Sequence, residues 1–156
     1  KLSTKGRYGL RALIDLALYS ENETVSIQSI ARRQNISDSY LEQLMRKLRS
    51  AGLIAASEVA GGYKLARPAN EISVGDVLRA LEGSLEAVTC GGEDNSCQGA
   101  DLCVTKFVWE RINSSIRDTV DSIKLSQLVE ESRLMREKGR FRYKNAIIKV
   151  YRKNGS

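Results

Sequence analysis

The chain has 156 residues, a net charge of +6 and no histidine, which excludes catalytic dyads and metal sites built on imidazole. It contains no run of about 18 apolar residues, so we expect no segment to span a membrane. Residues 1–70 carry 11 Lys or Arg against 6 Asp or Glu, residues 71–135 carry 6 against 12, and residues 136–156 carry 8 against 1. Basic segments attract polyanions, which leaves two interpretations of the basic ends open, a nucleic-acid partner and a solvated surface.

Three helices are predicted in the N-terminal part of the chain. Residues 4–20 carry one apolar stripe, and Ser3 or Thr4 can cap the start of this helix. A second helix is predicted over residues 26–34 and a third over residues 38–50, with a tight polar turn between them. The stripe of the third helix consists of Leu41, Leu44, Met45 and Leu48.

A hairpin is predicted next, because β-like runs at residues 53–57 and 63–66 flank Gly61-Gly62. Helix, helix, short turn, helix and hairpin is the order of a winged helix-turn-helix. Further helices are expected from Ser73, which opens a capping box, to Gly83, then over residues 101–123 and from about residue 126 to 135. The fold class is therefore mainly α with a small β wing, followed by a long helix.

Three parts follow from these elements. Residues 1–83 are expected to form the winged helix-turn-helix with a supporting helix, and residues 84–135 a cysteine loop with a long helix. Residues 136–156 form a basic tail in which basic and apolar residues alternate, as in a strand or an arm, and no structure is predicted for it.

The outer face of the third helix offers groups that can read DNA, because the major groove admits a helix whose outward side chains meet base edges. Gln43 can pair with adenine, and Glu42 can accept from cytosine while repelling phosphates. Lys5 and Arg7 near the start of the first helix, together with Lys1 and Arg11, can fix the register on the phosphate backbone. The candidate residues on the third helix are Ser39, Tyr40, Glu42, Gln43, Arg46 and Lys47.

Each of these candidates also has a structural interpretation. Ser39 and Glu42 fit a capping box that would commit Glu42 to the backbone, and Tyr40 can belong partly to the core. Polar residues on the outer face of any helix resemble this set.

All three cysteines, Cys90, Cys97 and Cys103, lie within 14 residues. Their spacing differs from the paired knuckle of a structural zinc site, and thiolates are the preferred ligands of iron–sulfur clusters. A zinc site, a redox dithiol and ordinary free thiols remain alternatives. The odd number of cysteines and the absence of a secretory signal favour a reducing cytoplasm over a disulfide framework.

Four motifs together resemble one family of winged-helix repressors. They are LSTKGRYG at residues 2–9, SYLEQL at residues 39–44, GGY at residues 61–63 and the cysteine loop. The family includes the iron–sulfur cluster regulator IscR, the nitric-oxide sensor NsrR and the cysteine-metabolism repressor CymR, and the resemblance covers residues 1 to about 130. It implies a homodimer with a dimerisation helix over residues 101–123, a 2Fe–2S cluster on the three cysteines, and groove-facing Ser39, Tyr40, Glu42 and Gln43.

The sequence departs from this family at two places. The family's histidine cluster ligand corresponds here to Lys106, whose protonated amine cannot ligate iron. The fourth ligand is therefore open, with Glu93, Asp94, Asp101, water and a thiol from solution as alternatives. The wing lacks the arginine that the family inserts into the minor groove, so either this hairpin reads DNA differently or residues are missing from it.

We therefore expect a cytoplasmic, homodimeric transcription repressor that binds double-stranded DNA and senses an iron–sulfur cluster. Cluster-assembly proteins are further expected partners, and no enzyme activity is expected because no catalytic constellation is present. The alternatives are a nitric-oxide-responsive or partner-enzyme-regulated repressor of the same family and, from another class, a small redox or electron-transfer protein.

Overall fold

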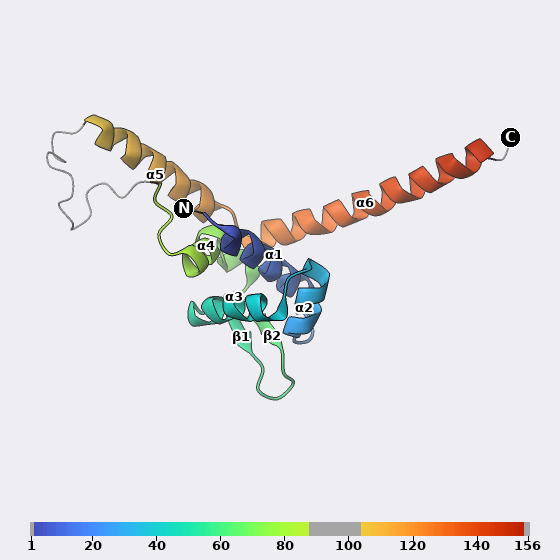
Figure 1. The fold of residues 1–156 in the computed structure, drawn as a ribbon, viewed down its shortest axis with the longest axis horizontal. Coiled ribbons are helices and arrows are strands. Elements are labelled where there is room, and N and C mark those ends of the chain that lie inside the picture. The colour runs from blue at the N-terminus through green and yellow to red at the C-terminus, as the bar shows by residue number, and fades with distance from the viewer. Residues whose placement is uncertain (1, 88–103, 155–156) are drawn as a thin grey trace.

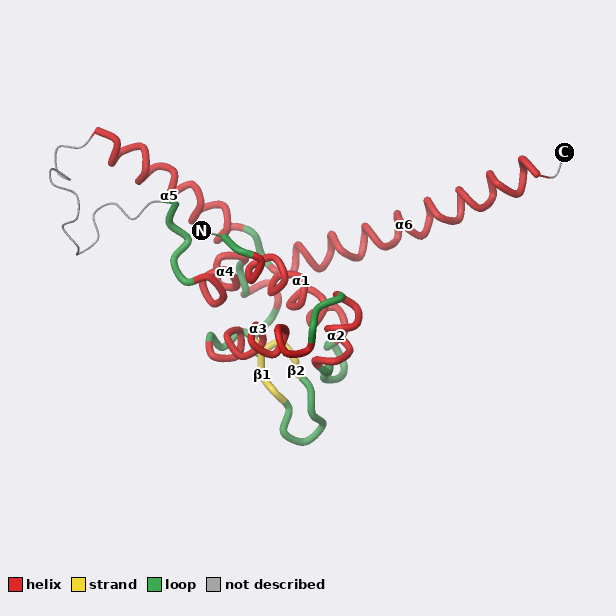
Figure 2. The backbone as a smooth tube through the Cα atoms, viewed as in Figure 1, coloured by secondary structure: helices red, strands yellow, loops and turns green. Residues whose placement is uncertain are grey.

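The computed structural model describes residues 2–87 and 104–154, with side chains as far as Gly139, and most of these residues are helical (Figures 1 and 2). In chain order the elements are α1 (Thr4–Tyr19), α2 (Ile27–Gln34), α3 (Asp38–Ser50), β1 (Ile54–Ala56), β2 (Tyr63–Leu65), the short 3-10 helix η1 (Ala69–Glu71), α4 (Val74–Glu82), α5 (Val104–Ser122) and α6 (Leu125–Asn154). The prediction of a mainly helical chain with a small β wing is confirmed.

Serine side chains cap the first three helices, because a serine oxygen accepts one of the backbone N–H groups that a helix start leaves unpaired. The caps are Ser3, Ser26 and Ser37. The hydroxyl of Ser37 accepts from the backbone N–H of Tyr40 at 3.3 Å. The capping box suggested for Ser39 and Glu42 is therefore wrong, since α3 begins two residues earlier and the side chain of Glu42 stays exposed.

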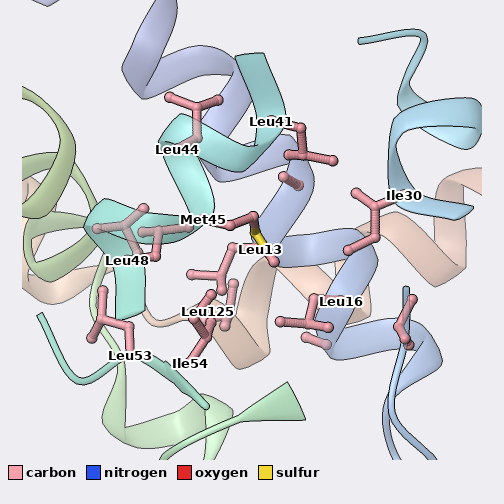
Figure 3. Close-up of a cluster of buried hydrophobic side chains, with 14 of the residues drawn as sticks. Leu13, Leu16, Ile30, Leu41, Leu44, Met45, Leu48, Leu53, Ile54 and Leu125 are labelled. Carbon is pink, nitrogen blue, oxygen red and sulfur yellow. The ribbon is translucent and has the colours of Figure 1, made fainter. Parts of the chain in front are cut away.

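The core lies between α1, α2, α3, α4 and the first strand, and the first turn of α6 closes it (Figure 3). The four stripe residues of α3 are each at most 1% exposed. Removing a leucine side chain from water in this way contributes about 1.5–3 kcal/mol. Leu125 at the start of α6 is also only 1% exposed, so the long C-terminal helix is anchored in this core.

The wing is an antiparallel hairpin in which Ile54 pairs with Leu65 and Ala56 with Tyr63. Val25, before α2, adds a bridge to Tyr63, with two backbone hydrogen bonds of 2.8 Å. Gly62 is required at the turn, because its φ is +76° and a Cβ there would lie 2.8 Å from the carbonyl oxygen of Val25.

The junction between α5 and α6 is tied to the start of α4. The N–H of Val74 donates to Ile123 and the N–H of Leu125 donates to Ile72, both at 2.8 Å. The capping box predicted at Ser73 is confirmed, with Asp76 as its second member. From this junction α5 and α6 leave the body in different directions (Figure 1).

The helix α6 is longer than the sequence analysis foresaw. It continues to Asn154, through most of the basic tail for which no structure was predicted. Among the described residues, no helix combines the length and the apolar character needed to cross a membrane.

Candidate nucleic-acid interface

Four of the candidate DNA-reading side chains form one exposed stripe on α3. Ser39, Glu42, Gln43 and Arg46 lie at i, i+3, i+4 and i+7, opposite the buried leucines. Within the described part of the chain, none of these four side chains makes a hydrogen bond or an ion pair. Their donors and acceptors are therefore available to an external ligand.

The other two candidates on α3 lie at the edge of this stripe and are engaged with the protein. The ring of Tyr40 packs edge-on against Tyr8, with centroids 6.0 Å apart, and its hydroxyl is buried without a partner among the described residues. The ammonium of Lys47 donates to the backbone carbonyl of Leu81 at 3.5 Å. A contact between the hydroxyl of Tyr40 and DNA requires it to leave this buried position, whereas the side chain of Lys47 is exposed and its ammonium has further N–H donors.

Basic side chains at the start of α1 fall into two groups. Lys5 and Arg7 are exposed, and their charged groups have no hydrogen-bond or ion-pair partner among the described residues. Arg11 instead donates to the backbone carbonyl of Gln34 at 2.8 Å and lies over the ring of Tyr8, at 5.3 Å. Arg11 thus holds α1 against α2, whereas Lys5 and Arg7 are available to phosphates. Lys1 lies outside the described residues.

A carboxylate from α4 holds the first turn of α1, which the sequence analysis missed. One oxygen of Glu82 accepts from the backbone N–H of Ser3 at 3.0 Å, from the hydroxyl of Ser3 at 2.7 Å and from the N–H of Gly6 at 2.8 Å. Burial raises the pKa of Glu82, but these hydrogen bonds and the charge of Lys5 outweigh it, so the pKa lies below its ordinary value.

A buried carboxylate also joins α1 to α2. Asp15 is 1% exposed and accepts from Arg33 at 2.7 and 2.9 Å and from the side-chain amide of Gln34 at 2.9 Å. The hydrogen bond to Asp15 raises the pKa of Arg33 above its ordinary value, although burial opposes this. This network fixes the angle between α1 and α2, and no local sequence pattern identifies it.

The three cysteines lie outside the described residues, but both ends of their segment meet α5. The N–H of Ala87 donates to the side chain of Asn113 at 2.8 Å, and α5 itself begins at Val104. The cysteine-bearing segment therefore links two points on the same helix. Among the described residues, no group of three or more His, Cys, Asp or Glu residues could hold a metal ion.

The three cysteine thiols fit an iron–sulfur cluster, but the residue at the family's histidine position does not. Three thiolates are suitable ligands for iron. Lys106, at the histidine position, lies 3.8 Å from the carboxylate of Glu110 one turn further along α5. A protonated ammonium has no lone pair for a metal.

An exposed apolar face runs along α5. Phe107 is 66% exposed, Val108 48% and Ile112 38%, and Leu2 beside them is 58% exposed. Together with Ile116 and Val120, these residues line one groove. A contiguous exposed apolar surface of this kind marks an interaction site.

Comparisons with known proteins agree with this arrangement. Residues 2–131 match the Rrf2 family, described as iron-dependent transcriptional regulator. A curated relative, the HTH-type transcriptional regulator IscR of Pectobacterium atrosepticum, is 42% identical over 136 residues, which is 86% of this chain and 82% of that protein.

Solved structures of the same kind are also similar. The global cysteine regulator CymR of B. subtilis has a TM-score of 0.69 and 36% identity, covering 84% of this chain and 97% of that chain. The IscR of T. potens has a TM-score of 0.68 and 43% identity, covering 85% of this chain and 88% of that chain.

Proposed function

Because this chain belongs to the Rrf2 family and is a DNA-binding transcription regulator, we propose that it represses genes by reading the major groove of duplex DNA with α3. The observation that carries this proposal is the stripe of four free polar side chains on a helix whose other face is buried. In the proposed complex Gln43 pairs with adenine, Glu42 accepts from cytosine and Arg46 contacts phosphate or guanine. Ser39 completes the stripe with a phosphate or base contact.

Lys5 and Arg7 supply phosphate contacts from α1 that fix the register without reading sequence. Tyr40 and Lys47 remain predicted contacts, and the hydroxyl of Tyr40 has to leave its buried position to make one. We propose that this protein acts in the cytoplasm, which contains the DNA and keeps cysteine thiols reduced.

The functional unit in this proposal is a homodimer joined through the apolar face of α5. A second copy of α5 would bury Phe107, Val108 and Ile112, which are exposed in the single chain. The two α3 helices would then meet half-sites about one helical turn, roughly 34 Å, apart.

The regulatory input in this proposal is an iron–sulfur cluster, as the name of the IscR relatives implies. Cys90, Cys97 and Cys103 would hold it, and the 2Fe–2S type follows from the family resemblance. When bound, such a cluster would supply a labile centre that reports the iron and sulfur supply. Lys106 does not fit as fourth ligand, so that position falls to a carboxylate, water or an added thiol.

A substitution at Gln43 tests the reading of DNA by α3. Gln43→Ala should lower affinity by about 1–3 kcal/mol for duplexes with the preferred base pair and relax the preference at that position. Gln28→Ala, an equally exposed change on α2, should leave base preference unaltered. The measurement is enrichment from a random-sequence duplex pool, and equal loss on all sequences for Gln43→Ala would reduce this residue to a backbone contact.

The cluster is tested by anaerobic purification with iron and sulfide quantification. Cys90→Ala, Cys97→Ala and Cys103→Ala should each lose iron and colour, whereas Lys106→Gln should keep both. A colourless, iron-free wild-type protein would contradict the cluster, and loss of iron in Lys106→Gln would contradict its exclusion as a ligand.

A further inference from the structure

The first turn of α1 is capped from two sides, one near and one far in the sequence. The hydroxyl of Ser3 accepts from the N–H of Lys5 at 3.2 Å, as an N-cap residue does. In a capping box, a glutamate three residues further on returns a hydrogen bond to the N–H of the cap. That position is occupied here by Gly6, which has no side chain, and the carboxylate of Glu82 from α4 accepts from Ser3 in its place.

From this geometry we propose that Glu82 is a positioning residue for DNA binding, which fixes the first turn of α1 so that Lys5 and Arg7 stand in register with α3. The inference rests on the proposed function, because it concerns the phosphate contacts assigned there to Lys5 and Arg7. These two residues flank Gly6, whose N–H donates directly to Glu82 at 2.8 Å.

The close approach of α1 and α4 supports this role. A Cβ at Gly6 would lie 2.9 Å from Leu78 and 3.1 Å from the carboxylate of Glu82, and a Cβ at Gly9 would overlap Leu81. Glycine at these positions allows α1 and α4 to pack this closely, which brings the carboxylate of Glu82 within reach of the backbone of α1.

The same end of α4 also contacts the recognition helix. The carbonyl of Leu81, next to Glu82, accepts from Lys47 of α3. Two adjacent residues of α4 thus contact the first turn of α1 and the helix α3. The first turn of a helix leaves backbone N–H groups unpaired, and the carboxylate of Glu82 accepts from the N–H of Gly6.

The salt dependence of DNA binding tests this role with the full chain. The probe is a duplex enriched by the wild-type protein from a random-sequence pool, and affinity is measured over a series of KCl concentrations. Neutralising Lys5 and Arg7 together by substitution with glutamine should reduce the slope of log affinity against log salt by about 3.6 in the wild type, because the dimer loses four phosphate contacts and each removes about 0.9.

In a Glu82→Ala background, we expect the same pair of substitutions to change the slope by less than half of that amount. Glu82→Gln keeps the accepting oxygen and should restore the full effect of the pair. Ser3→Ala weakens the same cap at an exposed position outside the core. It should therefore also reduce the change in slope caused by substituting Lys5 and Arg7. Glu86→Ala removes the same charge from an exposed side chain four residues later and should leave the effect of the pair unchanged.

Two results would overturn the inference: an equal effect of the pair in the wild-type and Glu82→Ala backgrounds, or no effect of the pair in the wild type. The proposed function fails separately, if the wild-type protein does not enrich any duplex from the pool.

Discussion

The hydroxyl of Tyr40 provides a sharp test of the packing between α1 and α3. It is buried and has no hydrogen-bond partner among the described residues. Replacing Tyr40 with phenylalanine removes this hydroxyl and keeps the ring, so the edge-on contact with Tyr8 at 6.0 Å is preserved. We therefore expect Tyr40→Phe to stabilise the protein.

The size of this effect follows from the cost of the unpaired group. A buried hydroxyl without a partner costs about 1–3 kcal/mol, and Tyr40→Phe recovers that cost. With a dependence on urea of about 1–3 kcal/mol per molar, a gain of about 1 kcal/mol raises the unfolding midpoint by roughly 0.3–1 M.

Urea unfolding followed by circular dichroism measures this shift. Tyr8→Phe is the matched control, because the hydroxyl of Tyr8 is not one of the buried unpaired atoms, and it should not raise the midpoint. A midpoint for Tyr40→Phe at or below that of the wild type would refute the reasoning, since the hydroxyl would then have a partner in solution. A gain in stability with unchanged DNA affinity would remove Tyr40 from the predicted DNA contacts.

Three further predictions concern the helices that support the recognition helix. Asp15→Ala should lower the free energy of unfolding by about 3 kcal/mol. This is the low end for breaking a buried ion pair, because Arg33 keeps 31% of its side chain exposed. Asp118→Ala, at an exposed position, is the control and should change the urea midpoint little. Gly9→Ala should lower the free energy of unfolding by about 1–3 kcal/mol, because the added Cβ overlaps Leu81. Gly139→Ala meets nothing within 4 Å and favours the helix, so it should raise thermal stability by about 0.5–1 kcal/mol. A loss of thermal stability in both variants would contradict this distinction. The hydrogen bond and charge of Arg79 lower the pKa of Asp121 below its ordinary value of 3.8. This pair therefore stabilises the folded protein above pH 3.8, and the stabilisation is lost as the pH falls through the lowered pKa of the folded state. Asp121→Asn should remove this part of the acid dependence of the urea midpoint, and an unchanged pH profile would refute the prediction.

Local signals account for the parts of the fold that the sequence predicted well. The stripe of leucines on α3, the glycine pair of the wing and the capping box at Ser73 each depend on residues a few positions apart. The start of α3 at residue 38 was predicted correctly, and only the alternative capping box at Ser39 was wrong, because Ser37 and Ser39 are both acceptable caps. Ser37 caps the helix because Asn35, in the left-handed conformation with φ of 54°, ends α2 just before it.

The length of α6 was missed for a different reason. The basic tail carries two patterns at once, because basic and apolar residues alternate at residues 140–143 and 148–151, while Tyr143, Ile147, Val150 and Tyr151 lie at i, i+4, i+7 and i+8. The alternation favoured a strand or an arm, and the helical spacing was overlooked. The helix α6 starts at a buried turn that contains Leu125 and Val129, and it continues through residues with this spacing.

The candidate interface shows most clearly what a local pattern cannot supply. The outward residues of α3 were predictable, because the opposite face of the same helix identifies them. The cap that holds Lys5 and Arg7 was not, because Ser3 and Glu82 are separated by 79 positions and the residue that would normally complete the motif is a glycine. Seen alone, Gly6 weakens the prediction of a helix; packed against α4, it is the residue that admits the carboxylate. A feature that looks like a local defect in the sequence is thus the point where two distant helices are joined.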